Sequence, residues 1–242
     1  MSELPLTHVL NQVFGGAIAA AMHAMGLSAS PATVIDDTLA WEILVVGGLI
    51  AFFLLVRLTL SVDRPNTAQQ VAEMIHEFTG ELGEQIIGHD YGRFQAFTTS
   101  IFLFVVLNNL LGLIPGIDTP TGHPVVPLGL AVLTFVYYNY HGIRVQGPVK
   151  YVKHFAGPVG WLSPLMFPIE IVSHCARVLA LTIRLYANML ASDLVTLVFF
   201  SMVAVVIPSI FLGLHFMVSL IQAYVFMLLS MIYLSEATAT EH

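Results

Sequence analysis

The chain has 242 residues, of which 57% are hydrophobic and only 10% are charged, and its formal net charge is −7. Soluble domains carry roughly 25% charged residues, so this composition excludes a water-soluble protein and predicts an integral membrane protein. The negative charge and the lack of a basic tract exclude nucleic acid as a partner. The single cysteine, Cys175, has no second cysteine in the chain with which to form a disulfide.

Residues 1–38 precede the first segment that we expect to span a membrane, and we interpret them as an external N-terminal segment. The apolar stretch Val9–Leu27 lies within this segment. Because no Lys or Arg precedes it, the stretch lacks the basic region of a signal peptide, and we expect it to be retained.

Residues 39–153 predict three spanning helices and one amphipathic helix. Leu39–Leu58, Phe94–Ile114 and Pro124–Ile143 each hold about 20 mainly apolar residues, enough to cross a ~30 Å hydrocarbon layer. Between the first two spans, the apolar residues of Thr67–Ile87 recur at helical spacing on one face. The opposite face carries four acids: Glu73, Glu77, Glu81 and Glu84. We expect this helix to lie at the membrane interface or against a partner.

The basic residues predict the orientation of the chain in the membrane. Six of them lie in loops or at span ends: Arg57, Arg64, Arg93, Arg144, Lys150 and Lys153. If the spans alternate in direction, all six fall on one side, and the positive-inside rule makes that side cytoplasmic. We therefore expect five spans, with the N-terminus outside and the C-terminus in the cytoplasm.

Residues 154–242 predict a long helical hairpin. Residues 169–207 contain neither glycine nor proline, and a continuous helix of that length would be about 58 Å long. Because this is nearly twice the hydrocarbon thickness, the helix must tilt strongly or break near Asn188–Ser192. Pro164 and Pro168 suit its start. We expect a turn near residues 203–207 and a last helix that ends near Leu234. The predicted fold is thus an all-α polytopic membrane protein.

Between residues 155 and 235 there are only four formal charges: Glu170, Arg177, Arg184 and Asp193. A charge at the centre of a bilayer costs about 2.5–3.5 kcal/mol on insertion scales, so such residues are functional candidates by default. A turn near residue 203 or 204 places Asp193 level with His215 and Arg184 level with Gln222. Arg184 and Asp193 are nine residues apart, so they serve different surfaces unless the helix is distorted between them.

The spacing of the polar residues also predicts which of them share a helix face. One face of the first hairpin helix holds five of them: Glu170, His174, Arg177, Arg184 and Asn188. His215, Ser219 and Gln222 share a face of the second helix by the same logic.

Structural interpretations of these residues stay open beside the functional ones. Glu170 and Arg177 could neutralise each other as a buried pair, whereas Arg184 has no acid one turn away. His215 alone would fit a core histidine, but beside Asp193 it could relay protons. The amides of Asn188 and Gln222 fit interhelical hydrogen bonds as well as a channel lining. We interpret Asn108 and Asn109, in the second span, as residues that form interhelical hydrogen bonds. The sequence has no metal-binding spacing, phosphate loop or nucleotide motif, so we expect no metal and no cofactor.

The segment from Arg184 to Asp193, with the sequence RLYANMLASD, resembles the signature of subunit a of F-type ATP synthases. The segment from His215 to Gln222 is similar to the last helix of that family, and Asn108–Gly116 is similar to its second span. The stretch from Pro168 to Arg177 resembles the start of its long helix. The resemblance covers about residues 40–235.

This resemblance implies a proton-conducting stator subunit and no catalytic activity of its own. In the family, a tilted hairpin lies against a rotating ring of proteolipid c subunits, and the arginine that corresponds to Arg184 faces the carboxylates of the ring. It implies an outer half-channel lined by Asn188, Asp193, His215 and Gln222, and a cytoplasmic one with Glu170 and either His174 or Arg177. The implied partners are the c-ring, the peripheral-stalk b subunits, the other ATP synthase subunits and the lipid bilayer.

Two other classes of protein fit the same charges. A self-contained secondary transporter would use Arg184 to bind an anionic substrate, and it would move solute as a purified chain. An assembly subunit would hold its charges as buried pairs, and it would tolerate Arg184→Ala wherever the complex still forms.

Overall fold

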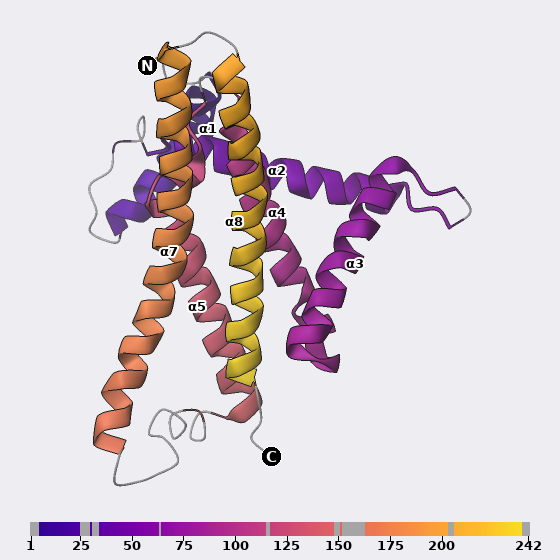
Figure 1. Ribbon diagram of the computed structural model, residues 1–242, viewed down its shortest axis with the longest axis vertical. Coiled ribbons are helices and arrows are strands. Elements are labelled where there is room, and N and C mark those ends of the chain that lie inside the picture. Colours follow the sequence, from indigo (N-terminus) through magenta and orange to yellow (C-terminus); the bar gives the residue numbers. More distant parts are fainter. Residues whose placement is uncertain are drawn as a thin grey trace. The chain divides into compact units, whose positions relative to one another are not determined.

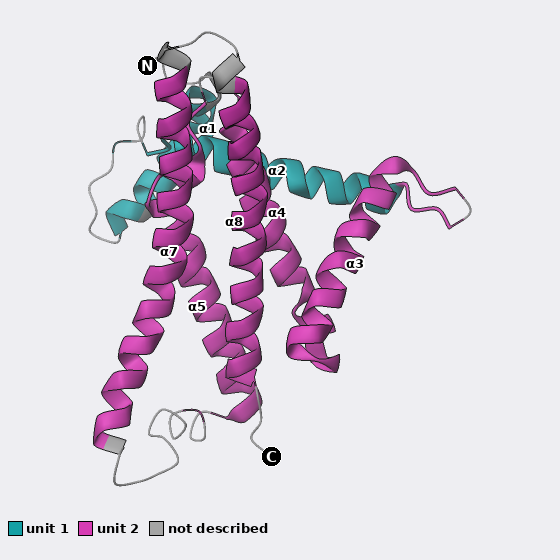
Figure 2. Cartoon of the chain, viewed as in Figure 1, with its two compact units in different colours: residues 1–58 teal, residues 59–242 magenta. Residues whose placement is uncertain are grey.

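The computed structural model describes residues 5–24, 30, 34–62, 64–114, 117–147, 151, 163–202 and 206–238. The expected all-α fold is confirmed, because every regular element of these residues is a helix (Figure 1). The chain divides into two compact units, Met1–Leu58 and Thr59–His242 (Figure 2).

The first unit contains α1 (Pro5–Ala24) and α2 (Asp37–Leu58). Asn11 joins them, because its amide group donates to the carbonyl oxygen of Ile35 at 2.9 Å and its Oδ1 accepts from the N–H of Ile35 at 3.0 Å. α2 is apolar and largely exposed, and it is one of three helices long and apolar enough to cross a membrane. Its bounds agree with the predicted first span. α1 holds most of the stretch Val9–Leu27, whose last residues lie outside the described part of the chain.

The second unit contains the remaining helices: α3 (Thr67–Ile87), η1 (His89–Arg93), α4 (Gln95–Leu111), η2 (Pro120–Gly122), α5 (Val125–Gln146), α7 (Ser163–Met202) and α8 (Val206–Thr238). Figure 1 shows α7 and α8 side by side over most of their length. α4 and α5 both pack against α8, and α5 also packs against α7. The short helix η2, in the connection between α4 and α5, contacts α7.

The amphipathic helix α3 has the predicted bounds, and Asn66 caps its first turn by accepting from the N–H of Thr67 at 2.7 Å. Part of its apolar face packs within the chain: Leu82 and Ile86 join a cluster with Phe94 and Met231. Val71, Met74 and Phe78 of the same face stay exposed. Contacts with α4, η1 and α8 therefore explain only part of the apolar pattern.

The predicted spans Phe94–Ile114 and Pro124–Ile143 correspond to α4 and α5. α4 has 17 residues and counts as a short apolar helix. The helices that meet both length and hydropathy for a span cover Asp37–Leu58, Pro164–Phe199 and Ser209–Thr238. A total of five spans therefore stays a prediction.

The hairpin differs from expectation in two details. α7 is one helix of 40 residues, so the alternative of a break near Asn188–Ser192 is wrong. α8 ends at Thr238, four residues beyond the predicted end at Leu234, so Glu236 also lies on this helix. Stacked rings of Phe199 and Phe211, with centroids 4.1 Å apart, pair the helices near the turn. Part of that turn, residues 203–205, lies outside the described residues.

A buried apolar cluster fills the centre of the four-helix part of the second unit. α7 contributes Leu181, Leu185 and Met189, which recur every four residues and so lie on one face. The other members come from α4, α5 and α8: Ile101, Val105, Ala131, Ala223 and Phe226. In lipid, such helices are held together by close packing, because leaving the bilayer for the bundle brings little hydrophobic gain.

Candidate functional site

His215 and Asp193 meet in a buried polar network near the end of the hairpin where α7 and α8 are joined. His215 is 1% exposed, and its Nδ1 lies 3.5 Å from Oδ1 of Asp193 and 2.8 Å from the hydroxyl of Ser192. This contact confirms that Asp193 and His215 lie at the same depth. The Nε2 atom lies 3.3 Å from the carbonyl oxygen of Asn109. Since a carbonyl only accepts, Nε2 carries the hydrogen and Nδ1 is the nitrogen that takes up a further proton.

The connection between α4 and α5 completes this outer network. The hydroxyl of Thr119 donates to Oδ1 of Asp193 at 2.8 Å, and the hydroxyl of Thr121 donates to Oδ1 of Asn109 at 2.6 Å. The amide of Asn109 donates to the carbonyl oxygen of Ser219 on α8 at 3.2 Å. Asn109 therefore forms the interhelical hydrogen bond that its type and position predicted.

A second network lies near the other end of the hairpin. Nδ1 of His174 is 2.8 Å from the hydroxyl of Tyr138 on α5, and Nε2 of His174 is 3.5 Å from Oε1 of Glu170. Arg177 donates to Oε1 of Glu236 on α8 at 2.8 Å, and its guanidinium lies 5.1 Å from the ring centre of Tyr233. The pairing of Glu170 with Arg177 is thus wrong: each has another partner.

Arg184 lies between the two networks, ten residues from His174 and nine from Asp193 along a continuous helix. Its side chain is exposed, while its neighbour Leu185 is 1% exposed inside the apolar cluster. Within the described residues, Arg184 makes no hydrogen bond and no ion pair. The helix is regular between Arg184 and Asp193, so these residues serve different surfaces, as their spacing predicted.

Two other predicted site residues extend from these groups. Asn188 is exposed on α7, one turn beyond Arg184, and Gln222 is half-buried on α8, close to one turn beyond Ser219. Neither side chain makes a hydrogen bond to another residue in the described part of the chain.

The structure adds site residues that sequence reasoning missed. They are Thr119, Ser192, Tyr138 and Glu236, with Thr121 behind them. All except Ser192 lie outside the segments Arg184–Asp193 and His215–Gln222, which contain the predicted residues of the outer network. Residues with a hydroxyl group are also too common in the sequence to be singled out by type. The available signal for Thr119 was its setting in a Thr-Pro-Thr-Gly segment directly after a span.

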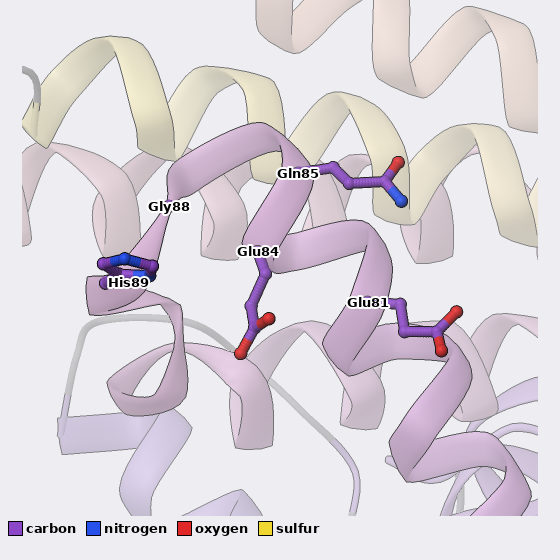
Figure 3. Close-up of a pocket in the computed structure, with 5 residues that line it drawn as sticks. All are labelled: Glu81, Glu84, Gln85, Gly88 and His89. Atoms are coloured by element: carbon purple, nitrogen blue, oxygen red, sulfur yellow. The ribbon is translucent and has the colours of Figure 1, made fainter.

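A surface hollow of about 400 Å³ lies apart from both networks, at the end of α3. Its lining consists of Glu81, Glu84, Gln85, Gly88 and His89, and Figure 3 shows the carboxylates of Glu81 and Glu84 pointing in different directions. No group of three His, Cys, Asp or Glu side chains is arranged to hold a metal ion in the part of the chain that the structure covers. The described residues of the hollow therefore do not form a metal site.

Together these features define a helical membrane protein with ionisable residues inside its spans, the class that moves ions or protons across a bilayer. The family model described as ATP synthase A chain matches residues 39–235, and the chain belongs to this family, the proton-translocating subunits of the membrane sector. The expected resemblance is confirmed. The alternative of a stand-alone transporter is not supported.

Individual relatives agree with this family. The chain is 46% identical over 241 residues to ATP synthase subunit a of Koribacter versatilis, covering 99% of this chain and 98% of the relative. It is 46% identical over 201 residues to that of Solibacter usitatus, covering 83% and 86%. With the protein of Bdellovibrio bacteriovorus the identity is 41% over 172 residues, covering 71% and 75%. As a subunit of an ATP synthase, the chain has other subunits of that complex as partners.

Proposed function

We propose that this chain guides protons through two half-channels that meet at Arg184, where the rotor ring supplies the moving carboxylates. The observation that carries the proposal is the position of Arg184: exposed on a continuous α7, midway between two buried polar networks. A guanidinium keeps its charge, so in a membrane it needs a carboxylate from a neighbour. A ring of proteolipid c subunits is the partner that fits.

The outer half-channel is built around Asp193 and His215, and Asn188 and Gln222 continue it toward Arg184. Two buried oxygens near this network, Oδ1 of Asn108 and Oγ of Ser219, have no hydrogen-bond partner among the described residues. Water is a donor that suits such acceptors. The inner half-channel contains Glu170, His174 and Arg177, with Tyr138 and Glu236 as their partners.

Arg184 couples proton movement to rotation. A ring carboxylate in lipid holds its proton, because desolvation disfavours the charged form. Beside the guanidinium the charged form is favoured, so the proton leaves into one half-channel. The fixed positive charge also repels a proton that would pass directly between the half-channels.

The chain performs no covalent chemistry in this proposal. It is a stator subunit of a bacterial inner membrane, with its N-terminus outside and its C-terminus in the cytoplasm, and the b subunits of the peripheral stalk hold it against the ring. Residues 1–38 form an external segment, residues 39–153 carry three spans and α3, and residues 154–242 carry the proton path.

The test is ATP-driven acidification of inner-membrane vesicles that contain the assembled complex. Arg184→Ala should abolish acidification, and Arg184→Lys should not restore it, because the planar delocalised charge is lost. The matched control is Leu179→Ala, since Leu179 is 56% exposed on the same helix and apolar. Normal acidification by Arg184→Ala at equal complex abundance would contradict the proposal and leave Arg184 a structural charge.

A further inference from the structure

We propose that Thr119 is a positioning residue that holds the carboxylate of Asp193 in place for proton exchange with His215. The inference rests on the proposed function of the outer half-channel. It assigns a role to the connection between α4 and α5, which lies outside the hairpin.

Thr119 and His215 both face the Oδ1 atom of Asp193. Thr119 is 1% exposed, and its hydroxyl donates to Oδ1 at 2.8 Å. Nδ1 of His215 lies 3.5 Å from the same Oδ1. Rotation of the carboxylate about its χ2 angle would carry Oδ1 away from the histidine. The hydrogen bond from Thr119 opposes this rotation.

Two glycines, Gly112 and Gly122, leave room for the contact between Thr119 and Asp193. A Cβ atom on Gly112, at the end of α4, would collide with the hydroxyl of Thr119 and would lie 3.1 Å from Nε2 of His215. A Cβ on Gly122 would lie 3.2 Å from Oδ2 of Asp193. The two glycines thus let the connection approach both α7 and α8 closely.

Thr121 contacts Asn109, the residue of α4 that faces His215. Its hydroxyl, on a residue 0% exposed, donates to Oδ1 of Asn109, and the carbonyl oxygen of Asn109 accepts from Nε2 of His215. The segment 119–121 therefore contacts the carboxylate directly and also contacts Asn109, the residue whose carbonyl oxygen faces the imidazole. This arrangement is a built site rather than a chance contact of a loop.

The proton step itself is simple. The Nδ1–H bond of protonated His215 breaks and an O–H bond forms at Oδ1 of Asp193, which leaves a neutral imidazole and a neutral carboxylic acid; the reverse step restores both charges. Transfer requires the 3.5 Å separation to shorten to about 2.6–3.2 Å. A hydroxyl can donate to a carboxylate and accept from a carboxylic acid, so Thr119 can hold the side chain in both states.

The experiment is a double-mutant cycle in the assembled ATP synthase. Vesicles stripped of the catalytic sector are given a potassium diffusion potential, and the initial rate of proton uptake is measured per assembled membrane sector. Thr119→Val keeps the shape of the side chain and removes its donor, and we expect a rate about tenfold lower. Thr119→Ser should stay within about twofold of the unmodified protein. Asp193→Asn should also lower the rate, and adding Thr119→Val to it should change nothing more.

The control is Thr182→Val, because the hydroxyl of Thr182 is buried but donates only to the carbonyl of Val178 in its own helix. If Thr119→Val prevents assembly, Gly122→Ala tests the position of the carboxylate instead. Its Cβ atom would lie 3.2 Å from Oδ2 of Asp193, close enough for the carboxylate to shift by a few tenths of an ångström while the hydroxyl of Thr119 stays. Unchanged proton uptake in these variants would overturn the role of Thr119. The same holds if Thr119→Val lowers the uptake rate by the same factor with and without Asp193→Asn. Unchanged uptake in Asp193→Asn would overturn the proposed function of Asp193, and the inference with it.

Discussion

The two buried histidines are held in the same way at opposite ends of the hairpin. In each, Nε2 faces an oxygen that only accepts: the carbonyl of Asn109 for His215 and the carboxylate of Glu170 for His174. In each, Nδ1 faces a hydroxyl, that of Ser192 or of Tyr138. Both rings therefore carry their hydrogen on Nε2 and offer Nδ1 as the atom that exchanges protons.

This arrangement predicts a specific effect of Tyr138→Phe. The variant removes the hydroxyl that faces Nδ1 of His174. Where this hydrogen bond is worth about 1 kcal/mol in the transition state of proton transfer, ATP-driven acidification should slow about fivefold. Tyr140→Phe is the control, because Tyr140 lies on the same helix and is 57% exposed. Equal rates in the two variants would show that the hydroxyl of Tyr138 has no part in conduction.

At the scale of elements, the register of the hairpin was predictable and its partners were not. An antiparallel pair about one turn has a single free parameter, so counting residues sufficed to place Asp193 beside His215. Thr119 contacts the outer network from the connection between α4 and α5, and Tyr138 contacts the other network from α5. The periodicity of the sequence does not predict how those elements pack against the hairpin. Glu170 and Arg177 share a face but lie about 10 Å apart along the helix axis. Because α8 extends past Leu234, Glu236 lies close enough to form the ion pair with Arg177.

The ion pair between Arg177 and Glu236 should stabilise the pairing of α7 and α8. The glutamate side chain is 54% exposed, so screening limits the contribution to about 1 kcal/mol. Glu236→Gln should lower the midpoint of thermal unfolding of the purified membrane sector by about 2–4 °C. Glu84→Gln removes an exposed acid from α3 and serves as the control. The same midpoint in both variants would show that the pair adds no stability.

At the scale of the whole molecule, no polar contact joins the two networks within the residues that the structure describes. Between His174 and Ser192, α7 buries Leu181, Leu185 and Met189, which pack with α4, α5 and α8. The buried polar side chain in this stretch, Thr182, donates to the carbonyl oxygen of Val178 in its own helix and does not extend either network. Moving a charge through such a layer costs several kcal/mol even after relaxation. The only charge at this depth on α7 is Arg184, which is exposed on the outside of the bundle.

The chain alone should therefore not conduct protons. Purified subunit in liposomes with a potassium diffusion potential should show no proton uptake above that of empty liposomes, because a proton in one network cannot cross the apolar cluster to the other. Liposomes with the complete membrane sector should take up protons, since ring carboxylates carry them past Arg184. Uptake by the isolated subunit would mean that a continuous polar path runs through its own helices. Arg184 would then gate that path instead of coupling it to a ring, and the conduction should vanish on replacement of residues in either network.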